Sequence, residues 1–254
     1  MIPADDSARI VELLQHSGLR RPCEIDNRCA NSRHKGLPTL ARTTAVSHPL
    51  IQHHLAHLRS RDTPAAEFRR RIQSLAILLA YEATHDLTTD SVAVETPLTK
   101  STGATLNQRI GLIPILRAGL GMVDPILDLI PSAEVWHLGL YRDETTATPV
   151  HYYSKIPPDK PVDVAFVLDP MLATGGSASA ALSTLADWGV TDLRLLSIIA
   201  APEGLENVRS QFPTTSVFVC AIDECLNDDK FIVPGLGDAG DRIFNTERPQ
   251  GETD

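Results

Sequence analysis

Residues 48–87 carry apolar side chains at helical spacing. One run contains Leu55 and Leu58, and a second run contains Phe68, Ile72, Leu75 and Leu79. Apolar residues that recur every three or four positions form one face of an amphipathic helix. The sequence RDTP between the runs offers a capping side chain and a proline suited to a first helical turn. The pattern therefore predicts two helices ahead of the main core.

From residue 110 onward the pattern changes to short apolar runs rich in β-branched residues. The runs read IGLIPIL, EVWHLGLY, DVAFVL, LRLLSIIA and SVFVCAI, and helical patterns fill the intervals GLGMVDPILDLI, SASAALSTLADWG and EGLENVRSQF. Strands that alternate with helices predict an α/β fold with a mainly parallel, twisted sheet flanked by helices. Ligands of such sheets bind at the carboxyl ends of the strands.

Residues 1–44 lack this organisation. Residues 8–15, ARIVELLQ, predict a short helix, but the polar segment that follows has no sustained period. We therefore expect residues 1–44 to be a partly flexible extension.

Composition narrows the class of protein. The chain has 254 residues, 43% of them hydrophobic, and a formal net charge of -9. This size and apolar content suit a folded globular protein. The acidic balance argues against a dedicated binder of nucleic acid or of anionic membranes, which needs a basic surface. No run approaches the roughly 20 apolar residues of a membrane span, and the four cysteines lack a zinc-site spacing. We expect a cytoplasmic enzyme with reduced cysteines.

The stretch VDVAFVLDPMLATGGS, residues 162–177, carries the candidate chemistry. If DVAFVL is a buried strand, Asp169 stands at its carboxyl end and the loop leads into the next helix. Gly175 and Gly176 allow backbone N–H groups to turn toward one point, and the helix start adds a partial positive charge. These groups can hold a phosphate monoester without a lysine. The loop lacks GxxxxGK[ST], which disfavours a nucleoside-triphosphate P-loop.

A strand, a carboxylate, TGG[ST] and a helix in this order resemble the phosphoribosyl diphosphate loop of type I phosphoribosyltransferases. The usual loop has two adjacent acidic residues, whereas Pro170 follows Asp169 here, and DPMLATGGS is similar to the loop of uracil phosphoribosyltransferases. HPLIQHHLAHLR, YEATHDL, PILRAGLGMVDPIL, GLYRDE, AAPEG and FIVPGLGDAGDRIFNT resemble further motifs of that family, in the same order. The resemblance implies a domain over residues 45–246 with a small C-terminal base-binding hood, followed by a tail over 247–254.

The resemblance also implies a reaction of pyrimidine salvage. The family transfers the 5-phosphoribosyl group of 5-phospho-α-D-ribose 1-diphosphate to uracil, which gives UMP and diphosphate. By this analogy Asp169, Asp238 and Arg142 are catalytic, and Mg²⁺ binds near Asp169 through substrate and water rather than through direct protein ligands. The implied substrate-binding residues are Arg117, Arg142, Asp169, Pro170, Met171, Leu172, Ala173, Thr174, Gly175, Gly176, Ser177, Ile232, Gly237, Asp238 and Ala239.

Each group has an implied role. Arg117 and Arg142 would contact the diphosphate, since a guanidinium binds phosphate oxygens bidentately. Ile232, Gly237 and Ala239 would read uracil through their backbone, and Asp238 would aid the magnesium water shell or the base proton. If the phosphate loop uses positive φ or close backbone approach, we expect a β-branched residue at Gly176 to weaken binding. The family also implies a homo-oligomer and a GTP or other nucleotide effector.

Other interpretations remain open at this point. The fold could serve a regulatory protein, either an RNA-binding attenuator or a silent sensor of pyrimidine nucleotides, although the acidic balance opposes RNA binding. TGGS alone could be a helix entry without a ligand. His53 and His57 lie one helical turn apart and suggest a metal site, but without an HExxH pattern we expect a solvated helix face.

Overall fold

The computed structural model describes residues 42–142, 149–154 and 160–246. These residues belong to one compact unit, Pro38–Asp254. The helix expected over residues 8–15 and the tail from residue 247 lie outside the described residues.

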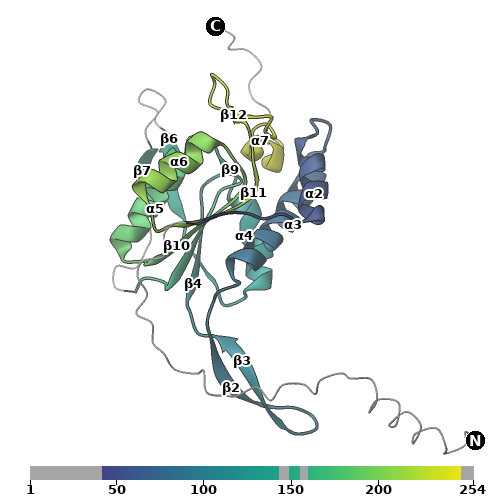
Figure 1. Cartoon of the computed structure of the whole chain (residues 1–254), viewed down its shortest axis with the longest axis vertical. Helices are drawn as coiled ribbons and strands as arrows, with labels where there is room; N and C mark the ends of the chain where they lie inside the picture. The colour runs from purple at the N-terminus through teal and green to yellow at the C-terminus, as the bar shows by residue number, and fades with distance from the viewer. Residues whose placement is uncertain (1–41, 143–148, 155–159, 247–254) are drawn as a thin grey trace, which may run out of the picture. The chain divides into compact units, whose positions relative to one another are not determined.

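A parallel sheet forms the centre of this unit (Figure 1). Neighbouring strands run in the order β1-β11-β10-β8-β4-β5, with the short β9 paired to β10, and every pairing in this sheet is parallel. The mainly parallel sheet predicted from the sequence is confirmed. The strands are β1 (Thr43–Ala45), β4 (Ile110–Pro114), β5 (Glu134–Val135), β8 (Val164–Leu168), β9 (Met171–Leu172), β10 (Asp192–Ala200) and β11 (Ser216–Ile222).

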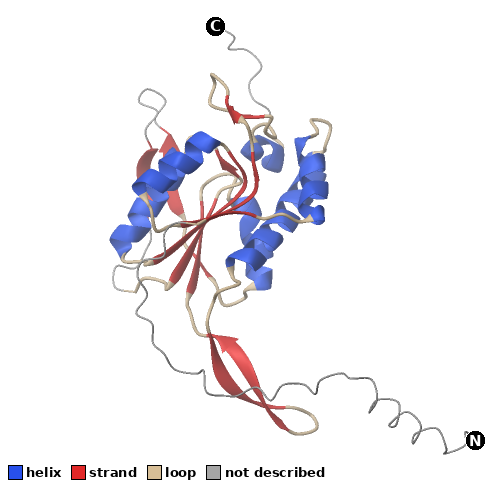
Figure 2. Cartoon of the chain, viewed as in Figure 1, coloured by secondary structure: helices blue, strands red, loops and turns tan. Residues whose placement is uncertain are grey.

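Helices cover both faces of the sheet (Figure 2). One face packs against α2 (Pro49–Arg59), α3 (Ala65–Ala83) and α4 (Leu120–Leu129), and the other against α5 (Gly176–Trp188) and α6 (Pro202–Gln211). Because successive side chains of a strand point to opposite faces, Phe166 joins the first apolar cluster while Ala165 and Val167 join the second. Strands buried on both faces explain the continuous apolar runs in the sequence.

The two N-terminal helices form as the periodicity predicts, but one of their caps differs. His48 caps α2, since its Nδ1 accepts the N–H of Leu50 at 3.1 Å. The N-cap of α3 is Pro64, which has no side-chain cap. Thr63, expected from RDTP as a cap, instead donates its hydroxyl to the carbonyl of His57 at 2.6 Å.

Two further regions depart from the sequence pattern. The run EVWHLGLY divides into β5 and β6 (Leu138–Arg142), and β6 pairs antiparallel with β7 (Pro149–Ser154) outside the main sheet. β2 (Thr89–Glu95) and β3 (Lys100–Leu106) form an antiparallel hairpin whose residues are largely exposed. Exposure on both faces removes the alternation by which a strand is recognised in a sequence.

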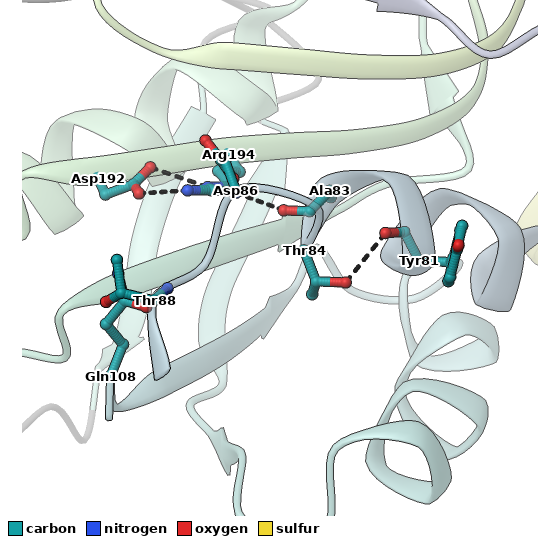
Figure 3. A network of polar contacts seen from close by, with 8 residues as sticks. All are labelled: Tyr81, Ala83, Thr84, Asp86, Thr88, Gln108, Asp192 and Arg194. Carbon is teal, nitrogen blue, oxygen red and sulfur yellow. Dashed lines mark hydrogen bonds and ion pairs between the residues drawn. The ribbon is translucent and has the colours of Figure 1, made fainter. Parts of the chain in front are cut away.

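A buried arginine anchors the start of this hairpin (Figure 3). Arg194 on β10 forms a bidentate ion pair with Asp192 and donates to Asp86, at 2.6 Å, and to the carbonyl of Ala83 at the end of α3. At the hairpin base, the N–H of Thr88 donates to Gln108 Oε1 at 2.9 Å. These contacts tie α3, the hairpin and β10 together.

The C-terminal hood comprises residues 225–246. Its elements are β12 (Cys225–Leu226), antiparallel to β13 (Ile232–Val233), and the short helix α7 (Ala239–Phe244). Across the described ranges, none of the helices has the length and apolar character needed to cross a bilayer.

Candidate active site

Asp169 follows β8 directly, at the carboxyl edge of the sheet, as the sequence predicts. Its N–H donates to the carbonyl of Leu196 at 3.2 Å, and its Oδ1 accepts the N–H of Met171 at 3.1 Å. Burial raises the pKa of Asp169 from its ordinary value of 3.8 to about 7, and the hydrogen bond from Met171 offsets only part of that rise. A carboxylate in this environment is poised to accept hydroxyl donors or to lie near a cation.

The loop after Asp169 is held to the sheet and ends in a helix start. The carbonyl of Pro170 accepts the N–H groups of Ile198 and Ile199, both at 3.1 Å, while β9 continues the pairing with β10. Gly175 is the N-cap of α5 with φ of 78°, and as a glycine it has no side chain with which to cap the helix. The N–H of Gly176 donates to Thr174 Oγ1 at 3.4 Å. Thr174–Ser177 therefore presents backbone donors and a helix dipole to an anion.

The left-handed conformation lies at Gly175 and not at Gly176, where the sequence offered positive φ or a close backbone approach as the reason for glycine. A Cβ at Gly175 would lie 2.9 Å from the carbonyl oxygen of Gly204. A Cβ at Gly176 would meet no protein atom closer than Thr174 Oγ1, at 3.7 Å. The protein itself thus demands glycine at position 175, whereas position 176 has open space.

Helix α6 supports the loop through two residues that sequence reasoning did not assign. Asn207 Nδ2 donates to the carbonyl of Thr174 at 2.8 Å. A Cβ at Gly204 would lie only 2.3 Å from the carbonyl oxygen of Ala173, so the loop rests directly on the helix backbone. Gly204 falls within the motif AAPEG, which was the only available signal, and Asn207 had none.

Arg117 lies on the loop between β4 and α4, which folds over the end of β8. The N–H of Ile115 donates to the carbonyl of Leu168 at 2.9 Å, and a Cβ at Gly119 would lie 2.3 Å from that same oxygen. The half-exposed side chain of Arg117 pairs with Asp241 of the hood at 3.0 Å. This loop therefore joins the Asp169 edge to the hood.

Asp238 and Arg117 approach each other at Gly240. Asp238 is the N-cap of α7, where its Oδ1 accepts the N–H of Asp241 at 2.9 Å. A Cβ at Gly240 would lie 3.2 Å from Asp238 Oδ1 and 3.6 Å from Arg117 Nη2. The side-chain ends of Asp238 and Arg117 therefore both lie beside Gly240, where a larger residue would crowd them.

The proposed base-reading residues lie in the hood. Ile232 belongs to β13 and is buried, and Ala239 is the fully buried first residue of α7. Gly237 has φ of 77°, a conformation that favours glycine. The loop between β13 and α7 thus turns at two glycines with positive φ and carries Asp238 as its one polar side chain.

One sequence expectation is placed only in part. Arg142 ends β6, with its backbone in register with Pro149, and its side chain lies outside the described part of the structure.

The rings of His53 and His57 on α2 are 4.8 Å apart, and Arg71 Nη1 lies 3.1 Å from His54 Nδ1. Burial, and next the charge of Arg71, lower the pKa of His54. Over the described ranges, no three His, Cys, Asp or Glu side chains gather into a metal-ligand group.

Comparisons with known proteins identify the same region. A family model described as uracil phosphoribosyltransferase matches residues 45–246. A uracil phosphoribosyltransferase from Roseiflexus sp. (strain RS-1) is 54% identical over 207 residues, which are 82% of this chain and 100% of that protein. One from Thermus thermophilus is also 54% identical over 207 residues, 81% of this chain and 100% of its own length.

A solved structure resembles the chain over a similar extent. The AQ2163 protein from Aquifex aeolicus has a TM-score of 0.76 and 38% sequence identity, and the match covers 80% of this chain and 98% of that one. The fold and the order of motifs therefore extend together over most of the chain.

Proposed function

From the premise that the chain belongs to the uracil phosphoribosyltransferase family, we propose that it transfers the 5-phosphoribosyl group of 5-phospho-α-D-ribose 1-diphosphate to uracil. A nitrogen of uracil forms the bond to C1 of the ribose, the bond from C1 to the diphosphate oxygen breaks, and the base loses a proton. The products are UMP and diphosphate. The observation that carries the proposal is the loop DPMLATGGS at the carboxyl end of a buried parallel strand, within a chain that matches the family over residues 45–246.

We assign the 5'-phosphate to Thr174–Ser177. The support is the start of α5, where the N-cap residue Gly175 has no side chain, the first N–H groups lack partners within the helix, and the dipole is positive. Pro170, Met171, Leu172 and Ala173 would form the wall of this site, since β9 and α6 hold their backbone in place.

Arg117 and Arg142 would bind the leaving diphosphate. Negative charge builds on that group as the bond to C1 breaks, so cations placed there stabilise the transition state more than the ground state. The exposed position of Arg117, paired only partly with the hood, supports this role.

Asp169 would accept hydrogen bonds from the ribose 2'- and 3'-hydroxyls. The position of Asp169 also suits Mg²⁺, because burial raises the pKa of this carboxyl group and a nearby cation would stabilise its ionised form. Mg²⁺ keeps several of its waters beside substrate phosphates. Bound Mg²⁺ would supply positive charge to the diphosphate. Asp169 itself would orient the sugar and remain ionised in the complex.

Uracil would be read by the backbone of Ile232, Gly237 and Ala239, with Asp238 between base and diphosphate. Fixed backbone groups that match the O4 and N3–H edge of uracil leave the N4 amino group of cytosine mispaired, at about 1–3 kcal/mol for each buried group. The approach of Asp238 and Arg117 at Gly240 supports the shared placement of base and diphosphate.

The decisive experiment measures diphosphate release by the purified protein with uracil, cytosine and hypoxanthine in parallel, with and without Mg²⁺. We expect release with uracil alone and only when Mg²⁺ is present. Equal release of diphosphate with all three bases, or release with hypoxanthine only, would refute the assignment. None of the observations above favours the RNA-binding or sensor alternative.

A cytoplasmic location, a homo-oligomeric state and a GTP or other nucleotide effector remain parts of the proposal. The exposed valines and leucines of the β2–β3 hairpin support association, because a two-stranded hairpin alone is marginally stable in water. Light scattering with and without GTP tests the last two parts together.

A further inference from the structure

An ion pair whose acidic member lies in none of the sequence motifs joins the end of α2 to the end of β11. Arg59 is the last residue of α2, and its Nη2 and Nη1 lie 2.6 and 2.8 Å from the two carboxylate oxygens of Asp223. The side chain of Asp223 is only 3% exposed. A buried carboxylate of this kind requires its partner, since an unpaired buried charge is strongly destabilising.

The same ion pair binds both polar groups of one residue in the hood. The N–H of Gly235 donates to Asp223 Oδ2 at 2.9 Å, and Arg59 Nη1 donates to the carbonyl of Gly235 at 2.8 Å. Gly235 has φ of 62°, and a Cβ there would lie 2.0 Å from the carbonyl oxygen of Ile232. The pair therefore fixes the backbone at the point where the loop turns back on β13.

A second arginine ties the next residue of the loop to the same helix end. Arg242 on α7 donates to the carbonyls of Leu58, on α2, and of Leu236, the latter at 2.7 Å. Its guanidinium lies 4.2 Å above the ring of Phe68 on α3. Gly235 and Leu236, the two residues directly before Gly237, are thus both held to the carboxyl end of α2.

We propose that Arg59 and Asp223 are positioning residues for base recognition: their ion pair holds the loop 234–237 so that the backbone of Gly237 and Ala239 meets the base edge. This inference rests on the proposed function. Neither residue needs to touch substrate. Backbone readers have no rotamers to adjust, so their selectivity depends on how rigidly the loop is held.

The test compares Arg59→Lys and Asp223→Asn with the unaltered protein. Lysine keeps the charge but cannot bridge Asp223 and Gly235 as a planar fork does, and asparagine keeps the shape of Asp223 without its charge. We expect the KM for uracil to rise about tenfold or more in both variants, while the KM for 5-phospho-α-D-ribose 1-diphosphate stays within about twofold. A variant that merely loses stability would not separate the two constants.

Arg109→Lys supplies the matched control. Arg109 also pairs with a carboxylate, Glu134 at 2.8 Å, but at the amino end of β4, on the sheet edge opposite Asp169. Its kinetics should match the unaltered protein.

Three results would overturn the inference. They are an unchanged uracil KM in the folded Arg59→Lys and Asp223→Asn proteins, an equal rise of both KM values, and failure of both variants to fold, which would assign the pair to core stability. These results are distinct from failure of the proposed function, in which the unaltered protein releases no diphosphate with uracil.

Discussion

At the scale of single residues, Asp169 links chemistry to stability. Because its pKa is raised, Asp169 of the folded, substrate-free protein keeps its proton between about pH 4 and pH 7, where the same residue of the unfolded chain has already lost it. The stabilising contribution is complete below about pH 4 and is lost as the pH rises through 7. Above that pH the free protein carries an unfavourable buried charge.

Asp169→Asn should therefore make the substrate-free protein more stable at pH 8, by roughly 1–3 kcal/mol, since one pKa unit corresponds to about 1.4 kcal/mol. Turnover should fall by about a hundredfold or more, because the amide loses the charge that orients the ribose. Melting temperatures of both proteins from pH 5 to pH 8 should diverge as the pH rises. Parallel curves, or near-normal turnover, would contradict this account.

Gly175 and Gly176 allow a paired comparison within one loop. Gly175→Ala should lower both stability and affinity for 5-phospho-α-D-ribose 1-diphosphate, because an L-residue pays about 1–2 kcal/mol at that φ and its Cβ meets Gly204. Gly176→Ala should leave the melting temperature unchanged yet still weaken binding, since its Cβ would occupy the space assigned to the phosphate. Calorimetric titration and thermal melting separate the two effects, and unchanged affinity in Gly176→Ala would remove the phosphate from this position.

At the scale of elements, helix α7 offers a clean removal of one donor. Ala239 is its first residue, where proline is compatible with a helix, and Asp238 before it has the extended ψ of 113° that a following proline requires. Ala239→Pro should lower uracil affinity about fivefold or more with little change in phosphoribosyl diphosphate affinity. Ala239→Ser keeps the N–H while adding bulk and serves as the control. Equal losses in both variants would attribute the effect to packing.

The elements also show how far the sequence could be interpreted. Buried strands and their intervening helices were predictable because apolar runs and helical periods alternate from Ile110 onward. The β2–β3 hairpin was not, since its residues face solvent on both sides. In the site, Asp169 and the glycine loop follow from a contiguous motif. The partners of Asp223 do not, because Arg59 lies 164 positions away and only the fold brings them together.

At the scale of the whole molecule, deletion of residues 1–40 should preserve uracil turnover. The residues assigned to substrate all lie beyond Arg109, the positioning residue Arg59 stays within the retained chain, and β1 starts at Thr43. The kcat and both KM values of the shortened protein should agree with those of the full chain within about twofold. A folded but inactive product would show that the extension contributes to the site or to assembly.

A deletion that ran only a few residues further would have a different outcome. β1 lies along the outer side of β11, where Val217 donates to the carbonyl of Arg42 and Val46 donates to that of Val219. Without Arg42–Val46, a row of backbone groups on β11 would be left open to strands of other molecules. Removal of residues 1–46 should thus yield a protein that aggregates during expression. We therefore expect the three-residue strand β1, Thr43–Ala45, to protect this sheet edge from association with other molecules.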